Sequence, residues 1–180
     1  KGYSDATIYY EGIKDIGYDT ATRYELMKAD TIILLSTPPA PALFRELILL
    51  SGAKRVVLGF GDESRLGINE LLRRLQGLLK HTIKCKGGII SLQELSTLLC
   101  TTEEFIELCL VYLKERGFID YLWEDGDQLT IYRGSNGKLN NRTQTLLHRS
   151  FYEMMSFKRY MYYQTTGKLE NLLKNPTRKI

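Results

Sequence analysis

The sequence predicts an α/β protein in which a small parallel-sheet unit is followed by a winged-helix-like α+β unit and a C-terminal helix. Three observations predict this order. Short β-branched and aromatic runs, bounded by turn residues, occupy the first third of the 180-residue chain. Apolar residues then recur at helical spacing up to a hairpin pattern. The last segment returns to helical spacing and is rich in aromatic and basic residues.

The first unit is expected to contain three strands, at residues 6–11, 31–36 and 54–60. Between the last two, a helix is expected to open at the prolines of 38–41, because proline is tolerated in a first helical turn, and to end at Gly52. A strand, helix, strand unit of this kind requires a right-handed crossover and a parallel strand pair. Residues 19–29 are expected to form a further short helix.

The period changes at Gly67, where leucines at helical spacing predict an amphipathic helix over residues 68–80. Residues 84–88, with two lysines and two glycines, are expected to be a flexible joint. Ser91 precedes Glu94 by three residues, which is the spacing of a capping box and predicts a helix start at Ser91.

A second helix is expected to begin at Thr101 or Thr102 and to end at Gly117 in a left-handed cap. Residues 118–123 and 128–132 then alternate around an Asp-Gly turn, which predicts a β-hairpin. Three helices followed by a two-stranded hairpin is the order of a winged helix.

These patterns divide the chain into an α/β unit (1–66), a winged-helix-like unit (67–134), a polar linker (135–141) and a basic, aromatic C-terminal helix (142–175). Charge is distributed unevenly along it. Residues 1–137 contain 16 basic and 19 acidic side chains, whereas residues 138–180 contain 9 basic and 2 acidic ones. A basic segment of this kind is typical of proteins that bind nucleic acid, an acidic peptide or an anionic surface.

The C-terminal helix supplies the candidate binding residues, because cations beside exposed aromatic rings bind single strands without sequence preference. The alternative is that the aromatic residues pack the helix onto the body while its basic residues form a solvated outer face. Both hold if the apolar side docks and the basic side faces outward. The candidates for contact with nucleic acid or a partner are Arg142, Arg149, Lys158, Arg159, Tyr160, Tyr163 and Lys168.

Composition argues against several other classes of protein. No run approaches the roughly 18 apolar residues of a membrane span. The three cysteines, Cys85, Cys100 and Cys109, are odd in number and lie in or beside apolar helical patterns, as expected of reduced, buried thiols in a cytoplasmic protein. The chain starts with Lys1 and has no leader pattern, so it is expected to be a fragment of a longer protein.

No motif for catalysis stands out. The Gly-Phe-Gly-Asp run at 59–62 follows a strand but lacks the third glycine of a dinucleotide fingerprint and the Gly-Lys-Ser/Thr of a P-loop, so a plain turn is favoured over a nucleotide site. His81 and Cys85 lie one helical turn apart without the paired spacing of a structural zinc site. No metal, no cofactor and no catalytic residue is therefore expected in this chain.

A winged helix also suggests a regulator that binds duplex DNA through residues 102–116. Glu103, Glu104 and Glu107 lie in the first turn of that helix, where they would repel phosphates. The same carboxylates stabilise a helix N-terminus, so they have a structural explanation as well. Duplex recognition remains the alternative function.

The order of parts resembles one family. The runs that carry the resemblance are LLSTPP at 34–39, FREL at 44–47, RVVLGFG at 55–61, ERGFI at 115–119 and the tail near Ser150-Phe151-Tyr152. Over about residues 24–175 the chain is similar to the C-terminal domain of RecJ, the bacterial single-stranded-DNA-specific exonuclease, in its form with a long C-terminal extension.

The resemblance implies a non-catalytic accessory module of a nuclease of DNA recombination and repair. The Asp-His-His motif of the RecJ core has no counterpart here, so no catalytic position is transferred. The parent would degrade single strands from the 5′ end with Mn²⁺ or Mg²⁺ held in an upstream core. The implied partners are single-stranded DNA, bound weakly, or the acidic, hydrophobic-ended tail of single-stranded DNA-binding protein.

Overall fold

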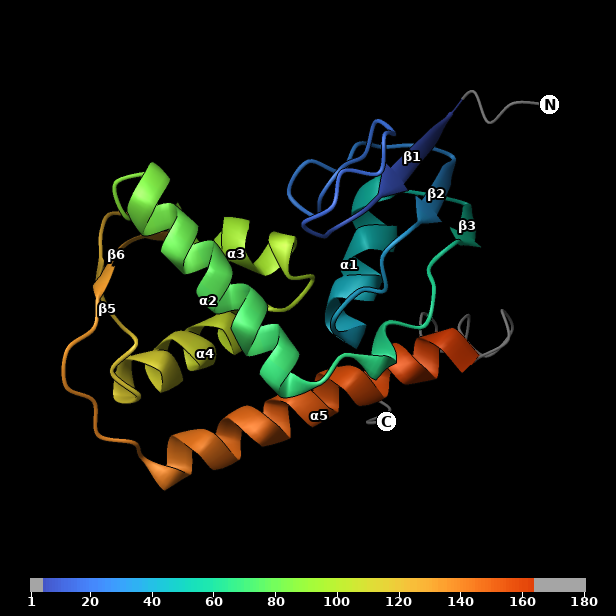
Figure 1. Ribbon diagram of the computed structural model, residues 1–180. Helices are drawn as coiled ribbons and strands as arrows, with labels where there is room; N and C mark the ends of the chain where they lie inside the picture. The colour runs from blue at the N-terminus through green and yellow to red at the C-terminus, as the bar shows by residue number, and fades with distance from the viewer. Residues whose placement is uncertain (1–4, 164–180) are drawn as a thin grey trace. The chain divides into compact units, whose positions relative to one another are not determined.

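The computed structural model describes residues 5–163 of the chain (Figure 1). These residues belong to two compact units. Unit 1 consists of the chain up to Arg65 together with the chain from Met154, and unit 2 consists of Leu66–Glu153. The predicted fold class, a parallel α/β sheet followed by a winged-helix-like part and a long C-terminal helix, is confirmed.

A three-stranded parallel sheet with the order β1-β2-β3 forms the centre of unit 1. Its strands are β1 (Ala6–Tyr9), β2 (Thr31–Leu34) and β3 (Arg55–Leu58), and α1 (Pro41–Ser51) connects β2 with β3. The helix begins at Pro41 rather than Pro38. Ala40 precedes a proline and is extended, as residues before proline usually are, so the helical turn starts only after it. Gly52 ends α1 at φ 62°, as predicted.

The core of unit 1 is built on one face of this sheet. Strand residues two apart point to the same face, and the register places Tyr9 beside Leu34. The second half of α5 (Asn141–Tyr163) supplies two of the core side chains. The buried members are Tyr9, Ile32, Leu34, Phe44, Leu47, Phe157 and Met161.

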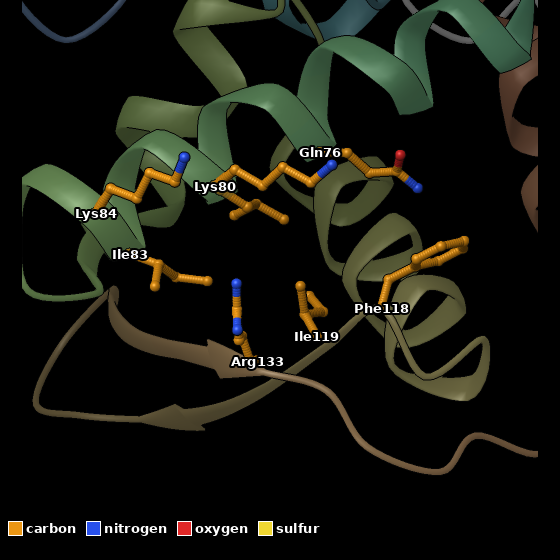
Figure 2. A pocket seen from close by; sticks show the side chains of 8 residues that line it. Gln76, Lys80, Ile83, Lys84, Phe118, Ile119 and Arg133 are labelled. Atoms are coloured by element: carbon orange, nitrogen blue, oxygen red, sulfur yellow. The ribbon is translucent and has the colours of Figure 1, made fainter.

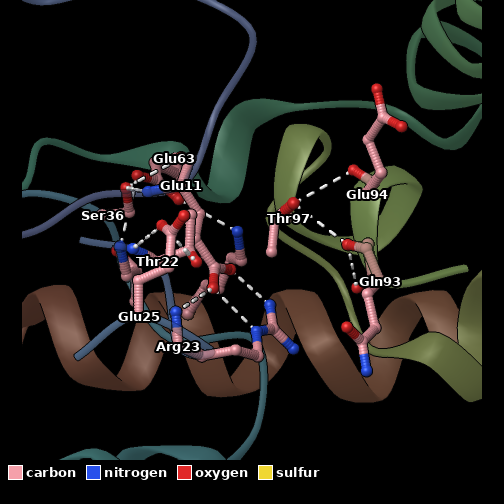
Figure 3. Close-up of polar contacts among 12 residues, drawn as sticks. Glu11, Thr22, Arg23, Glu25, Ser36, Glu63, Gln93, Glu94 and Thr97 are labelled. Atoms are coloured by element: carbon pink, nitrogen blue, oxygen red, sulfur yellow. Dashed lines mark hydrogen bonds and ion pairs between the residues drawn. The ribbon is translucent and has the colours of Figure 1, made fainter. Parts of the chain in front are cut away.

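Polar groups fill the carboxyl edge of the sheet, where many α/β proteins bind ligands. The Arg23 guanidinium forms a two-pronged ion pair with the Glu11 carboxylate, with Nε 2.7 Å from Oε1 (Figure 3). The Glu11 backbone N–H donates to Ser36 Oγ at 2.7 Å, and Ser36 Oγ donates to the Glu11 carbonyl. The polar groups of Glu11 and Ser36 are therefore hydrogen-bonded to each other and to Arg23. These contacts account for the arrangement as part of the fold.

The helix predicted over residues 19–29 does not form. Ala21 instead pairs with β1: the Tyr10 N–H donates to the Ala21 carbonyl, and the Ala21 N–H donates to the Ile8 carbonyl. A short turn follows, in which Thr22 is bonded to Glu25. Pairing with a sheet edge and the buried Arg23 contact are long-range interactions, and they override local helix propensity here.

Unit 2 has the element order of a winged helix. It contains α2 (Ile68–Cys85), β4 (Ile89–Ser91), α3 (Leu92–Leu98), α4 (Glu103–Glu115), β5 (Ile119–Trp123) and β6 (Gln128–Arg133). The three strands form an antiparallel sheet with the order β4-β6-β5. Both predicted helix starts are confirmed, since Ser91 Oγ accepts from the Glu94 N–H and Thr102 Oγ1 accepts from the Phe105 N–H. Gly117 is left-handed at φ 73°, also as predicted.

The segment predicted as a flexible joint is a tight turn that leads into an unpredicted strand, β4. The N–H of Gly88 donates to the Thr82 carbonyl, and its carbonyl accepts from the Ile131 N–H at 2.8 Å. Gly88 has φ 90°, and a Cβ there would lie 2.6 Å from the Ile131 oxygen. Glycine is therefore required at position 88 because the backbone of β6 lies too close for a side chain, and not because the segment needs to be mobile.

The first half of α5 belongs to unit 2. Phe151 packs against Phe105 of α4, with ring centroids 6.3 Å apart, and Thr143 Oγ1 donates to Glu115 Oε1 at 2.9 Å. The helix predicted over residues 142–175 is thus present from Asn141 to Tyr163 and contributes to both units. Its predicted continuation lies outside the described residues.

Candidate partner-binding pocket

Four of the candidate residues predicted on the C-terminal helix are exposed. Arg142 and Arg149 belong to unit 2, whereas Arg159 and Tyr163 belong to unit 1. Arg149 Nε lies 2.9 Å from Glu153 Oε1 in a solvent-exposed pair, which neutralises part of its charge at little gain in stability. The exposed cations of α5 are thus spread along the helix.

The other three candidates are placed differently. Lys158 is buried, and its Nζ donates to Glu63 Oε2 at 2.9 Å. Its charge is therefore used in an ion pair within unit 1 and is not available to a partner. Glu63 also accepts from the Thr37 N–H, which ties α5 to the loop after β2. Tyr160 packs beside the core of unit 1. Lys168 lies outside the described residues.

A cavity of about 520 Å³ opens in unit 2 between α2 and the β5–β6 hairpin. Figure 2 shows Lys80 and Lys84 extending from α2, with Arg133, Ile119 and Phe118 coming from the hairpin. We call it the basic pocket. Its lining consists of Gln76, Leu79, Lys80, Ile83, Lys84, Phe118, Ile119 and Arg133.

Helix and strand periodicity explain this lining. Gln76, Lys80 and Lys84 are four residues apart and form one row along α2, beside the apolar row of Leu79 and Ile83. Lys80 and Lys84 are separated by one helical turn, which is a rise of about 6 Å. On the hairpin, Ile119 stands directly opposite Arg133, so an apolar and a cationic side chain reach the pocket together.

The cations of the basic pocket are not neutralised locally. None of Lys80, Lys84 and Arg133 forms an ion pair within the part of the chain that the structure describes. Other cations of α2 differ, since Arg73 and Arg74 both pair with Glu70. Three cations around an apolar floor produce a local positive potential, which attracts an anionic group that also offers apolar surface.

The sequence contains only a weak signal for this pocket. The four-residue spacing of Lys80 and Lys84 is visible, but a row of cations on an amphipathic helix usually faces solvent. Arg133 joins them only through the register that sets it opposite Ile119 and on the helix-facing side of the sheet. That register is set by the tertiary structure and cannot be derived from the spacing of residues in the sequence.

Other parts of unit 2 are acidic. The first turn of α4 contains Glu103 and Glu104, with Glu107 one turn further on. The turn between β5 and β6 contains Glu124, Asp125 and Asp127. In a winged-helix DNA-binding protein the start of this helix enters the major groove and would meet phosphates there. The acidic first turn therefore disfavours that mode of binding.

Among residues 5–163, Cys100 and Cys109 are buried as expected, whereas Cys85, at the end of α2, is exposed. No three His, Cys, Asp or Glu side chains of that region gather as a metal ion would require. Burial raises the pKa of the Cys109 thiol far above its usual value, so this cysteine stays protonated and unreactive. None of the helices in that region is long and apolar enough to cross a membrane.

Comparisons of the chain with protein-family models, with curated proteins and with solved structures find no match.

Proposed function

We propose that this chain is a non-catalytic interaction module that binds an anionic partner at the basic pocket. The observation that carries the proposal is the presence of Lys80, Lys84 and Arg133, which have no ion-pair partner among the described residues, around an apolar floor. The lining contains no carboxylate, imidazole, thiol or hydroxyl group. Its reactive groups are cationic amines and a guanidinium, which suit the attraction and holding of an anionic ligand.

The resemblance to the RecJ C-terminal domain supplies the biological context of the proposal. The module would belong to a single-stranded-DNA-specific 5′–3′ exonuclease of recombination and repair in the cytoplasm, whose catalytic core would hold Mn²⁺ or Mg²⁺. Its task would be to recruit that core to its substrate. The partner would be single-stranded DNA, bound weakly, or the acidic tail of single-stranded DNA-binding protein.

Two titrations at two salt concentrations test this function. The chain is titrated with a labelled single-stranded oligonucleotide and with an acidic peptide ending in apolar residues. We expect at least one to bind, and we expect the affinity to fall as salt rises, because the attraction is between exposed charges. Absence of binding by both ligands at low salt would overturn the proposal.

A nuclease assay tests the non-catalytic part of the proposal separately. The purified chain is incubated with a 5′-labelled oligonucleotide and Mn²⁺, with and without a chelator. We expect the oligonucleotide to remain intact in both samples. Chelator-sensitive cleavage that copurifies with the chain would contradict a purely accessory role.

A further inference from the structure

We infer that the outward face of the unit 2 sheet is a second docking surface, which takes a basic amphipathic helix of a partner protein. This surface is distinct from the basic pocket and goes beyond the function proposed above. It consists of Ile89 of β4, Leu122 of β5 and Thr130 and Tyr132 of β6, and we call it the sheet patch.

The strand register places these residues together. Ile89 and Leu122 both stand opposite Thr130, so one row crosses all three strands. Tyr132 is two residues further along β6 and therefore points to the same face. The next row, Ile90, Leu129 and Trp123, points to the opposite face, where Ile90 and Leu129 are buried in the core.

The composition of the sheet patch is unusual for a solvated face. An antiparallel sheet with one side in water normally alternates apolar residues inward with polar residues outward. Here Ile89, Leu122 and Tyr132 stand at outward positions and remain 51%, 59% and 44% exposed. Several large apolar side chains gathered on one exposed face mark an interaction surface.

The carboxylate beside the sheet patch that forms no ion pair among the described residues is Glu124. It follows Leu122 by two residues and accepts from Thr130 Oγ1 at 2.7 Å, whereas Asp120, opposite Tyr132, is paired with Lys114. No lysine or arginine occupies an outward position of β4, β5 or β6. Carboxylates at the rim repel a phosphate backbone and attract lysine or arginine, so charge complementarity selects a basic protein segment over nucleic acid.

A helix is the occupant that fits a sheet face best. Sheets bury an apolar face by packing against a helix or another sheet, and a helix carries an apolar stripe flanked by polar residues. An amphipathic helix could cover Ile89, Leu122 and Tyr132 with its stripe while one of its cations reaches Glu124. Since the basic pocket attracts anions, the module could hold two partners of opposite charge.

The test uses a synthetic amphipathic peptide of Lys and Leu, about 15 residues long so that it can form a helix. We expect it to shift the backbone amide signals of β4, β5 and β6 in NMR spectra. A peptide of the same pattern with Glu in place of Lys should leave the Ile89, Leu122 and Thr130 signals unshifted, even where it binds at the basic pocket. Leu122→Ser with Ile89→Ser should weaken Lys/Leu peptide binding about tenfold or more, because both side chains lie at the centre of the contact.

Matched variants make the result specific. Leu49→Ser with Met27→Ser removes two exposed apolar side chains of unit 1 and should leave the affinity unchanged. Glu124→Gln keeps the apolar contact and should reduce the salt dependence of binding. Lys80→Glu with Lys84→Glu should abolish anion binding at the basic pocket without weakening this peptide, which separates the two proposals.

Three outcomes would overturn the inference. The first is equal binding of the Lys/Leu peptide by the chain and by its Leu122→Ser, Ile89→Ser variant. The second is a shift of the Ile89, Leu122 and Thr130 signals by an oligonucleotide and not by the basic peptide, because these three residues do not line the basic pocket. The third is self-association of the chain in sedimentation experiments that disappears in the same variant, because a second copy would then be the occupant.

Discussion

The ion pair between Glu11 and Arg23 joins the end of β1 to a segment without regular structure. The Glu11 side chain is fully buried and that of Arg23 is 7% exposed. Arg23→Met should therefore lower the free energy of unfolding by about 3–5 kcal/mol, because the Glu11 carboxylate would remain buried without its cation. Urea denaturation of both proteins measures the difference.

Lys54→Met provides the control for this substitution. Lys54 pairs with Asp30 on the surface, where both side chains are well exposed, so its removal should change stability little. Equal loss of stability in the two variants would show that burial does not increase the contribution of the Glu11–Arg23 pair to the free energy of unfolding.

Asp120, at the rim of the sheet patch, provides a prediction about pH. Its hydrogen bond with Lys114, and that with the Tyr121 N–H, hold the pKa of Asp120 below its ordinary value of 3.8. A carboxyl group with a lowered pKa stabilises the fold above its unfolded pKa, and this stabilisation is lost as the pH falls through the folded value. The same contact raises the pKa of Lys114, so its contribution is lost only as the pH rises beyond about 10.5.

NMR titration of the Asp120 carboxyl group checks that direction. We expect a midpoint below 3.8 in the unmodified chain and a higher midpoint in Lys114→Met. A midpoint that stays the same in Lys114→Met would show that the ion pair does not control the ionisation of Asp120.

At the scale of the elements, the turn between α2 and β4 makes the sharpest prediction. Gly88→Ala should destabilise the chain by about 1–3 kcal/mol, because a Cβ would meet the Ile131 carbonyl at 2.6 Å and the residue would be held at φ 90°. Gly77→Ala is the matched control. Gly77 lies within α2 with nothing near its Cβ position, so alanine should stabilise the helix by about 0.5–1 kcal/mol.

Thermal unfolding of both glycine variants measures this contrast. A loss for Gly88→Ala together with a gain for Gly77→Ala supports the tight turn. If Gly88→Ala behaved like Gly77→Ala, this segment would be the flexible joint that its composition suggested.

Elements with local signals could be predicted from the sequence. Pro41 and Gly52 bound α1, and Ser91 and Thr102 cap α3 and α4, because caps and breakers act within a few residues. β4 could not be predicted, since three residues carry too little pattern and their pairing partner lies about 40 residues away. The helix predicted over residues 19–29 does not form, because pairing of Ala21 with β1, a contact between distant residues, decides the conformation of this segment.

The candidate site shows a similar division. Exposed cations on α5 could be predicted from helical spacing, but the burial of Lys158 against Glu63 could not, because Glu63 lies 95 residues earlier in the chain. The basic pocket also depends on distant residues: α2 supplies two cations and β6 supplies the third. Periodicity identifies the face of an element, and only the tertiary fold identifies what that face meets.

At the scale of the whole molecule, the arrangement of charge matters more than its sum. Unit 2 contains equal numbers of Lys or Arg and Asp or Glu side chains. It nevertheless separates them into a basic pocket beside α2, an acidic start of α4 and an acidic hairpin turn. A unit without net charge attracts partners only through such local fields, so binding should be short-ranged and sensitive to salt.

The most direct test of the account compares two charge reversals of equal size for binding of the acidic peptide and of the single-stranded oligonucleotide. Lys80→Glu with Lys84→Glu alters the basic pocket, and Arg142→Glu with Arg149→Glu alters α5. We expect the pocket variant to lose about tenfold or more in affinity for the ligand that binds, and the α5 variant to lose much less. Affinity that falls only in the α5 variant would contradict binding at the pocket.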